Sequence, residues 1–197
     1  MAKNTQISDY IKIYDDMDHT DFYNRCIELF EDNISGLSNC NEDWRRCQIY
    51  TKLDSQGQMF EELKEIIRKV IDRYRKEIAN NNISFLKCIE APNIIRYISD
   101  DPDGKNLFHS HSDNWSMETA SRQLSIIIYL NDVEEGGATT FTDLNISVQP
   151  KKGRILVFPS FYTYPHQGEP PVSGRKYILV SWIHYGGKGH SYRVHNL

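Results

Sequence analysis

A series of short strand-like runs fills the second half of the chain and limits the folds that it can adopt. Gly, Pro and Asn/Asp turns separate the runs, a pattern typical of an antiparallel β structure. The runs cover residues 85–89, 93–98, 123–130, 139–141, 146–149, 154–158, 163–166 and 177–184. Because helical segments lead the chain, we predict an α+β fold, mainly β, in which N-terminal helices buttress a jelly-roll barrel on one side.

Two amphipathic helices are predicted before these strands, after a short opening strand over residues 10–14. The first begins at a capping Thr20 and continues to about residue 31. The longer one covers residues 56–79 and is preceded by a capping box made by Ser55 and Gln58. Its apolar side chains form one stripe that needs a sheet to cover it: Phe60, Leu63, Ile66, Ile67, Val70, Ile71, Tyr74 and Ile78.

The length of the chain bounds its domain organisation. With 197 residues it can form one well-buried domain and is too short for two independent ones. We therefore expect a single domain over residues 1–197, with helical support in 1–82, the jelly-roll core in 83–186 and a tail in 187–197. Residues 33–53 are polar and irregular, and we expect no chemistry there.

An insert over residues 99–107 is rich in acidic residues. Its spacing lacks the regular ligand alternation and terminal glutamate of an EF-hand loop, so we expect a plain loop or a lid rather than a calcium site.

Composition excludes several classes of protein. A hydrophobic content of 39% and a charged content of 25% are those of an ordinary soluble protein, and no apolar run reaches the length of a membrane span. The first residues lack the apolar core of a secretory signal, so we expect a cytoplasmic location. Four cysteines without CxxC spacing indicate free thiols. A net charge of −4 without a basic patch argues against a nucleic-acid partner.

One constellation of residues predicts a metal centre. His111 and Asp113 are two residues apart, so on an extended strand both side chains leave the same face. His166, which lies between two strand-like runs, is the natural third ligand. Two histidines and one carboxylate form the facial triad that suits non-heme iron(II) and leaves positions open for exchangeable ligands.

A lysine at the head of the last apolar strand needs an explanation. Lys176 precedes the run over residues 177–183, and a cation inside a mostly apolar barrel is costly unless an anion meets it. A dicarboxylic cosubstrate would be such an anion. Arg175 is one residue earlier on the strand and should point away from the barrel.

The order and spacing of these motifs resemble the 2-oxoglutarate- and iron(II)-dependent oxygenases, most of all their prolyl 4-hydroxylase-like branch. The resemblance runs from about residue 85 to about residue 186. Its motifs are Tyr97, Phe108-x-x-His111-x-Asp113, the segment from Tyr129 through Gly136-Gly137-Ala138-Thr139, Pro150-Lys151-Lys152-Gly153-Arg154, Phe158-Pro159-Ser160, His166 and Lys176.

The resemblance implies a double-stranded β-helix whose mouth holds the metal. It implies three kinds of site residue: iron ligands at His111, Asp113 and His166; cosubstrate contacts at Lys176, Tyr97 and Thr139; and peptide contacts at Arg122, Trp182 and His184. The even spacing of Lys176, Trp182 and His184 would place them on one face of a strand. Iron(II), 2-oxoglutarate, dioxygen and ascorbate are the expected cofactors and reactants.

The activity implied is hydroxylation of proline in a peptide or protein, with release of succinate and carbon dioxide. Two alternatives remain open from the sequence. One is a hydroxylase of a free amino acid or another small molecule, because the triad defines the chemistry and not the substrate. The other is a jelly-roll metal-binding module without turnover.

Overall fold

The computed structural model describes residues 6–53, 57–78, 86–99, 106–185 and 194–197. Its helices are α1 (Thr20–Asp32) and α2 (Gln58–Ile78), with short 3-10 turns η1 (Ile7–Tyr10), η2 (Ile34–Gly36) and η4 (Thr142–Leu144). Its strands are β1 (Lys12–Asp15), β2 (Ser38–Glu42), β3 (Arg45–Tyr50), β4 (Leu86–Glu90), β5 (Asn93–Ile98), β6 (Phe108–His111), β7 (Arg122–Tyr129), β8 (Thr139–Phe141), β9 (Ile146–Val148), β10 (Arg154–Pro159), β11 (His166–Gly168), β12 (Arg175–Tyr185) and β13 (Val194–Asn196).

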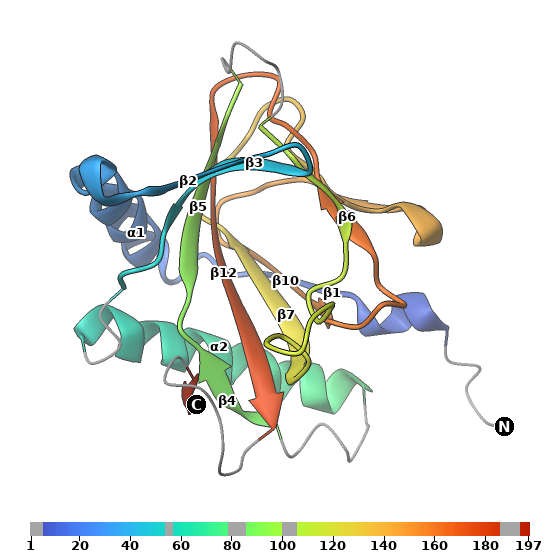
Figure 1. The fold of residues 1–197 in the computed structure, drawn as a ribbon. Helices are drawn as coiled ribbons and strands as arrows, with labels where there is room; N and C mark the ends of the chain where they lie inside the picture. The colour runs from blue at the N-terminus through green and yellow to red at the C-terminus, as the bar shows by residue number, and fades with distance from the viewer. Residues whose placement is uncertain (1–5, 54–56, 79–85, 100–105, 186–193) are drawn as a thin grey trace, which may run out of the picture.

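The described strands join into one antiparallel sheet that curls on itself (Figure 1). Its main path runs β1-β10-β7-β12-β5-β3-β6-β11-β8-β9, with β2, β4 and β13 attached at its sides. The long central strands β7, β10 and β12 lie against α2, while β6, β8 and β11 curl over the opposite side. This mainly β, curled arrangement is the predicted jelly-roll core with helical buttresses.

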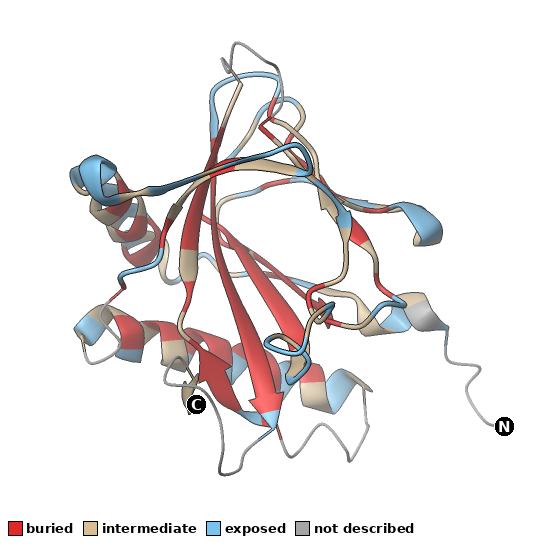
Figure 2. Cartoon of the chain, in the orientation of Figure 1, coloured by how far each residue is buried: buried red, intermediate tan, exposed pale blue. Residues whose placement is uncertain are grey.

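Alternate residues of the central strands serve two separate cores, as the two-residue period of a strand requires. Leu124, Ile126 and Ile128 of β7 pack with the apolar side chains of α1 and α2. The intervening Ile127 and Tyr129 face the interior of the curl instead. Figure 2 shows the consequence: buried residues cover the central strands and the sides of the helices that meet them.

The apolar stripe predicted on the long helix is confirmed. Phe60, Leu63, Ile66, Ile67, Val70, Ile71 and Tyr74 are buried, and Ile78 packs against the same core. The proposed capping residue Ser55 lies outside the described residues. In α1 the predicted cap is wrong, because His19 occupies the N-cap position and the Thr20 hydroxyl donates to the carbonyl of Met17 rather than accepting from the helix.

The N-terminal part of the chain contributes more than helical support. Strands β1, β2 and β3 all belong to the sheet, and β13 pairs with β4 although it lies in the predicted tail. The expectation that residues 33–53 are irregular is therefore wrong. Residues 38–50 form a hairpin whose register runs from Ser38 opposite Ile49 to Glu42 opposite Arg45.

Four further sequence predictions concern a strand, the acidic insert, the cysteines and membrane-spanning helices. The strand predicted over residues 163–166 begins only at His166, because a turn closed by the amide of Tyr164 and the carbonyl of Phe161 precedes it. Most of the acidic insert over residues 99–107 lies outside the described residues. All four cysteines are free thiols, as predicted. Within the described ranges, no helix is long and apolar enough to cross a membrane.

Candidate active site

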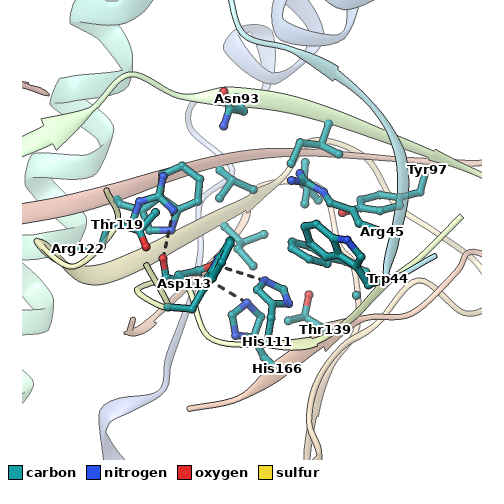
Figure 3. A pocket seen from close by; sticks show the side chains of 18 of the residues that line it. Trp44, Arg45, Asn93, Tyr97, His111, Asp113, Thr119, Arg122, Thr139 and His166 are labelled. Carbon is teal, nitrogen blue, oxygen red and sulfur yellow. Dashed lines mark hydrogen bonds and ion pairs between the residues drawn. The ribbon is translucent and has the colours of Figure 1, made fainter. Parts of the chain in front are cut away.

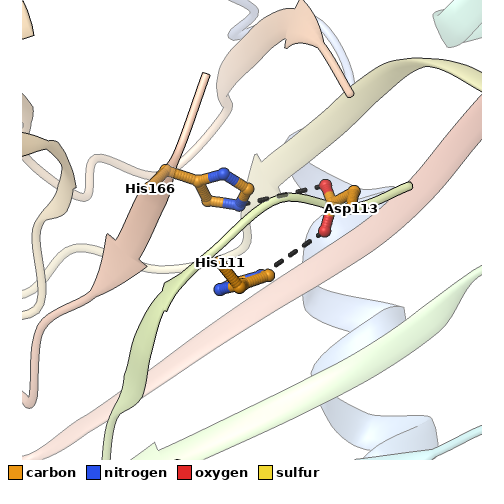
Figure 4. A group of neighbouring side chains, drawn as sticks. All are labelled: His111, Asp113 and His166. Carbon is orange, nitrogen blue, oxygen red and sulfur yellow. Dashed lines mark ion pairs between the residues drawn. The ribbon is translucent and has the colours of Figure 1, made fainter. Parts of the chain in front are cut away.

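Two antiparallel strands bring the predicted metal ligands together. His166 begins β11 and lies directly opposite His111, the last residue of β6, so the two imidazoles face each other across the ladder. Asp113 follows in the turn after β6 rather than on the strand, yet its carboxylate faces both rings (Figure 4). Its oxygens lie 3.4 Å from Nε2 of His111 and 3.9 Å from Nε2 of His166.

Backbone carbonyls orient both imidazoles. Nδ1 of His111 lies 2.8 Å from the carbonyl oxygen of His109, and Nδ1 of His166 lies 3.2 Å from that of Tyr164. A carbonyl accepts only, so each Nδ1 carries the proton and each Nε2 keeps its lone pair. The lone pairs are thus directed at the point that the Asp113 carboxylate also faces. Such outer hydrogen bonds commonly orient histidines that bind metals.

The ionisation states of the group fit a metal ion. Burial lowers the pKa of His166 to about 4, which keeps this imidazole neutral. Burial alone would raise the pKa of Asp113, but the two histidines and the hydroxyl of Ser125 hold it well below its usual range. Neutral imidazoles and an ionised carboxylate are the ligand forms that bind a cation. The three ligand atoms lie within 4.8 Å of one another, so the residues fit a non-heme iron(II) triad.

Aromatic rings and hydroxyl groups support the triad. The ring of Phe108 stacks on His111 at a centroid distance of 3.5 Å, and Phe158 meets His166 edge-on at 4.6 Å. The Ser125 hydroxyl bonds to Asp113 and lies 2.9 Å from that of Ser160. These contacts restrict the side chains to the orientation in which they converge.

The triad lines a cavity of about 250 Å³ inside the curl (Figure 3). Apolar residues of the central strands form much of its wall, among them Ile95, Ile127, Ile178 and Val180. All three tryptophans of the chain contribute to it: Trp44, Trp115 and Trp182. A concave, mostly apolar space with a few converging polar groups is the usual form of a small-molecule site.

Lys176 lies in this cavity and is almost fully buried, with 1% of its surface exposed. It pairs with Tyr97 across β12 and β5, and its Nζ lies 5.2 Å from the ring centre of Tyr97 and 5.8 Å from that of Tyr129. Burial lowers the pKa of Lys176 to about 7, although nearby Glu169 acts to raise it. A carboxylate entering beside Lys176 would remove the penalty of holding this cation.

Thr139 and Tyr97, the other predicted cosubstrate contacts, line the same cavity. The Tyr129 hydroxyl donates to Oγ1 of Thr139 at 2.7 Å and so orients it. Arg175 is exposed and lies 3.5 Å from Glu31, on the side of the strand away from the cavity, as the alternation predicts.

Arg122 and Trp182, two of the predicted substrate contacts, stand together at another wall of the cavity. The guanidinium carbon of Arg122 lies 3.5 Å from the centre of the Trp182 ring. The guanidinium donates to both oxygens of Glu90, at 2.9 and 2.8 Å, and to the carbonyl oxygen of Asp113 at 3.2 Å. Arg122 thus connects the wall of the cavity to the backbone of a predicted metal ligand.

His184 does not line the cavity, in contrast to Trp182. Where β12 pairs with β7, Ile183 lies opposite Leu124 and His184 opposite Arg122, so the extra residue is Gln123 of β7 and the even spacing of β12 continues to His184. The imidazole is held between Glu90, 3.2 Å from Nε2, and Ser121, 3.0 Å from Nδ1. Burial would raise the pKa of Glu90, but His184 and Arg122 lower it to about 2.

Comparison with known proteins shows which family the site resembles. Residues 92–184, which include the triad, Lys176 and most of the cavity strands, match the model of the 2OG-Fe(II) oxygenase superfamily. The match spans a little under half of the chain. The curated relatives that the chain resembles are prolyl 4-hydroxylases: the chicken (Gallus gallus) prolyl 4-hydroxylase subunit alpha-1 is 35% identical over 77 residues. That segment is 36% of this chain but only 15% of the chicken protein.

Solved structures share the fold. A Pseudomonas putida prolyl-4-hydroxylase superposes with a TM-score of 0.69 at 19% sequence identity, covering 90% of this chain and 94% of the other. A prolyl hydroxylase from Trichoplax adhaerens, solved in complex with a hypoxia inducible factor peptide fragment, gives a TM-score of 0.66 at 14% identity. The alignment covers 90% of this chain and 84% of the Trichoplax protein.

Sequence reasoning missed three residues that the structure brings to the site. Trp44 and Arg45, at the tip of the hairpin over residues 38–50, line the cavity. Glu90 holds both Arg122 and His184 from the end of β4. A signal for Glu90 was present, because a charged residue that ends an apolar strand calls for a buried partner.

Proposed function

We propose that the protein is a 2-oxoglutarate- and dioxygen-dependent iron(II) oxygenase that hydroxylates prolyl residues in a peptide or protein. The observation that carries the proposal is the convergence of the His111, Asp113 and His166 ligand atoms in a cavity that also holds the buried cation Lys176. When bound, iron(II) and 2-oxoglutarate would supply the oxidising chemistry, with cleavage of the keto acid to succinate and carbon dioxide.

The residues of the chain supply orientation and charge. His111, Asp113 and His166 would hold the metal from one side, with their protonation states set by the carbonyl contacts and the buried surroundings. Lys176 would receive the far carboxylate of the cosubstrate, assisted by the polar groups of Tyr97 and Thr139. The apolar wall excludes water from the reacting groups, which strengthens these electrostatic contacts.

The contacts around Arg122 suggest its role toward substrate. Glu90 fixes the guanidinium from behind, so one face of it covers the Trp182 ring, and both groups border the cavity. We infer that this stacked pair receives the segment that carries the proline. His184 would act indirectly, by holding the Glu90 carboxylate in place.

The prolyl substrate is supported by the named activities of the relatives, whose matched segments are small. The Trichoplax relative was solved with a peptide fragment, which favours a peptide over a free amino acid for this branch. A need for ascorbate and the cytoplasmic location predicted from the sequence stay predictions, as does the single-domain organisation.

The test is succinate formation from 2-oxoglutarate by the purified chain with iron(II) and ascorbate, with and without proline-containing peptides. Mass spectrometry of the peptides would locate an added oxygen. His111→Ala should abolish turnover and Lys176→Met should reduce it sharply, while Arg175→Met, at an exposed position, serves as the matched control. Stimulation by free amino acids but not by peptides would instead identify a small-molecule hydroxylase, and absence of turnover with both ligands bound would identify a binding module.

A further inference from the structure

The hairpin formed by β2 and β3 places a second, half-buried cation in the cavity. Arg45 begins β3, and its side chain extends from the hairpin into the space that the triad lines (Figure 3). The guanidinium carbon lies 4.5 Å from the centre of the Phe108 ring, which in turn stacks on His111. One aromatic ring therefore separates this cation from a predicted metal ligand.

The surroundings of Arg45 leave its charge without an anion. Its Nε is buried and has no hydrogen-bond partner, and the neutral Cys47 thiol and Tyr97 hydroxyl are its hydrogen-bonding neighbours. Within the described ranges, no carboxylate forms an ion pair with Arg45. A half-buried guanidinium without an anion is unfavourable, and so is the buried Nε–H without an acceptor.

The other cations of the cavity are already balanced. Arg122 forms two hydrogen bonds with the Glu90 carboxylate. With the proposed ligands bound, the remaining charges cancel. Two positive charges on the metal and one on Lys176 are balanced by one negative charge on Asp113 and two on 2-oxoglutarate. Among the lining residues that the structure describes, Arg45 is then the cation whose charge has no counterpart.

We propose that the substrate presents a carboxylate to Arg45, so that the enzyme acts on proline next to an acidic group. This inference rests on the proposed function and names its substrate class. The carboxylate could belong to an acidic side chain beside the proline or to the C-terminal end of the proline itself. A planar guanidinium binds either one through two parallel hydrogen bonds.

A rival assignment is that Arg45 serves the cosubstrate, because Tyr97 lies beside both Arg45 and Lys176. The two assignments predict different losses when Arg45 is replaced. A cosubstrate role would weaken 2-oxoglutarate binding whichever peptide is present. A substrate role would weaken only peptides that carry the carboxylate.

The experiment is a binding titration of the full chain under anaerobic conditions with iron(II) and 2-oxoglutarate, followed by tryptophan fluorescence. All three tryptophans line the cavity, so binding should change the signal directly. The probes are isosteric pairs: acetylated Asp-Pro and Asn-Pro amides, acetylated Pro-Asp and Pro-Asn amides, and acetylated proline as acid or amide. These pairs separate an acidic side chain on either flank from a free C-terminal carboxylate.

The variants are Arg45→Met, which removes the charge, and Arg45→Lys, which keeps it without the planar fork. Arg46→Met is the matched control, because this next residue of the hairpin lines a different cavity with Asn39 and Asn106. We expect the wild type to bind one acidic probe about 10- to 100-fold more tightly than its neutral isostere. Arg45→Met should abolish that preference, Arg45→Lys should keep part of it, and Arg46→Met should leave it unchanged.

Two results would overturn the inference. One is equal binding of every acidic probe and its neutral isostere by the wild type. The other is weaker 2-oxoglutarate binding by Arg45→Met with the preference for the acidic peptide intact.

Mass spectrometry of the same probes after exposure to oxygen separates the carboxylate site from the prolyl hydroxylase activity. Hydroxylation of acidic and neutral prolyl probes at equal rates would reject the carboxylate site and keep the prolyl hydroxylase. An Arg45-dependent preference without hydroxylated proline would keep the carboxylate site and reject the prolyl activity.

Discussion

Replacement of Lys176 by methionine should stabilise the ligand-free protein while weakening its affinity for 2-oxoglutarate. The ammonium group is 1% exposed and lies among Tyr97, Tyr129 and the apolar cavity wall. Methionine has a similar length and no charge, so it can fill the same space without the desolvation penalty. A binding site that is strained in the absence of its ligand commonly lowers stability in this way.

The size of the effect follows from the pKa of Lys176, which burial lowers from its ordinary value of 10.5 to about 7. A difference of that size corresponds to about 5 kcal/mol, and about 4 kcal/mol of it is present at pH 7. Because the pKa is lower in the folded state, the unfolded state binds more protons between pH 7 and about pH 10. The penalty is therefore complete below pH 7 and disappears as the pH rises to about 10.

Urea unfolding of the metal-free chain at pH 6, 7 and 10 would measure this penalty. At pH 7 we expect Lys176→Met to exceed the wild type by up to about 4 kcal/mol, and at pH 10 we expect the two to converge. Arg175→Met is the control, since its exposed side chain should change stability by about 0.5 kcal/mol or less. A variant that is less stable than the wild type at pH 7, with the pH dependence unchanged, would refute the reasoning.

The same variant tests the ligand role of Lys176. With metal present, 2-oxoglutarate should raise the melting temperature of the wild type by mass action and should raise that of Lys176→Met much less. Loss of the charge-assisted contact predicts affinity about 10- to 100-fold weaker. Equal protection of both proteins would show that the cosubstrate carboxylate does not meet this lysine.

Three further outcomes are expected. Ser125→Ala, which removes the hydroxyl bonded to Asp113, should weaken metal binding about 10-fold in a cobalt(II) titration; unchanged affinity would mean that Asp113 is oriented without it. Gly153→Ala should lower the free energy of unfolding by about 2–4 kcal/mol, because at a φ of 77° the new Cβ would lie 2.0 Å from the carbonyl oxygen of Asp16. The control is Gly36→Ala, whose new Cβ meets nothing within 4 Å and should leave the free energy of unfolding nearly unchanged. Binding of 2-oxoglutarate at pH 8 should take up about one proton, seen by calorimetry in buffers of different ionisation enthalpy, because the new ion pair raises the pKa of Lys176.

The elements that the sequence predicted well are those whose pattern is local. The alternation of β7 and β12 divides their residues between two cores, and the same alternation placed Lys176 inside and Arg175 outside. The long helix showed its stripe for a similar reason, since a period near 3.6 needs no knowledge of the partner. The convergence of His111 with His166 was proposed from ligand chemistry, because the predicted strands did not include β6 and the run predicted over residues 163–166 ends where β11 begins.

The hairpin over residues 38–50 could not be predicted on these grounds. Strand β2 is largely exposed, and the two buried residues of β3, Cys47 and Tyr50, belong to different cores. A strand with one buried residue on each face carries no clear alternating pattern. The cavity residues Trp44 and Arg45 therefore lie in the segment whose sequence was least informative.

His184 shows the converse limit, since its spacing was regular but did not bring it to the cavity. The even spacing from Lys176 through Trp182 continues to His184, because the extra residue at this point of the ladder is Gln123 of β7. The imidazole contacts Glu90, which fixes Arg122 over Trp182. A residue that the resemblance assigned to the substrate thus supports Arg122, for which we propose a substrate contact, so His184→Gln should weaken peptide binding and leave 2-oxoglutarate binding intact. Equal loss of both in the fluorescence titration would show that the cluster supports the whole cavity instead.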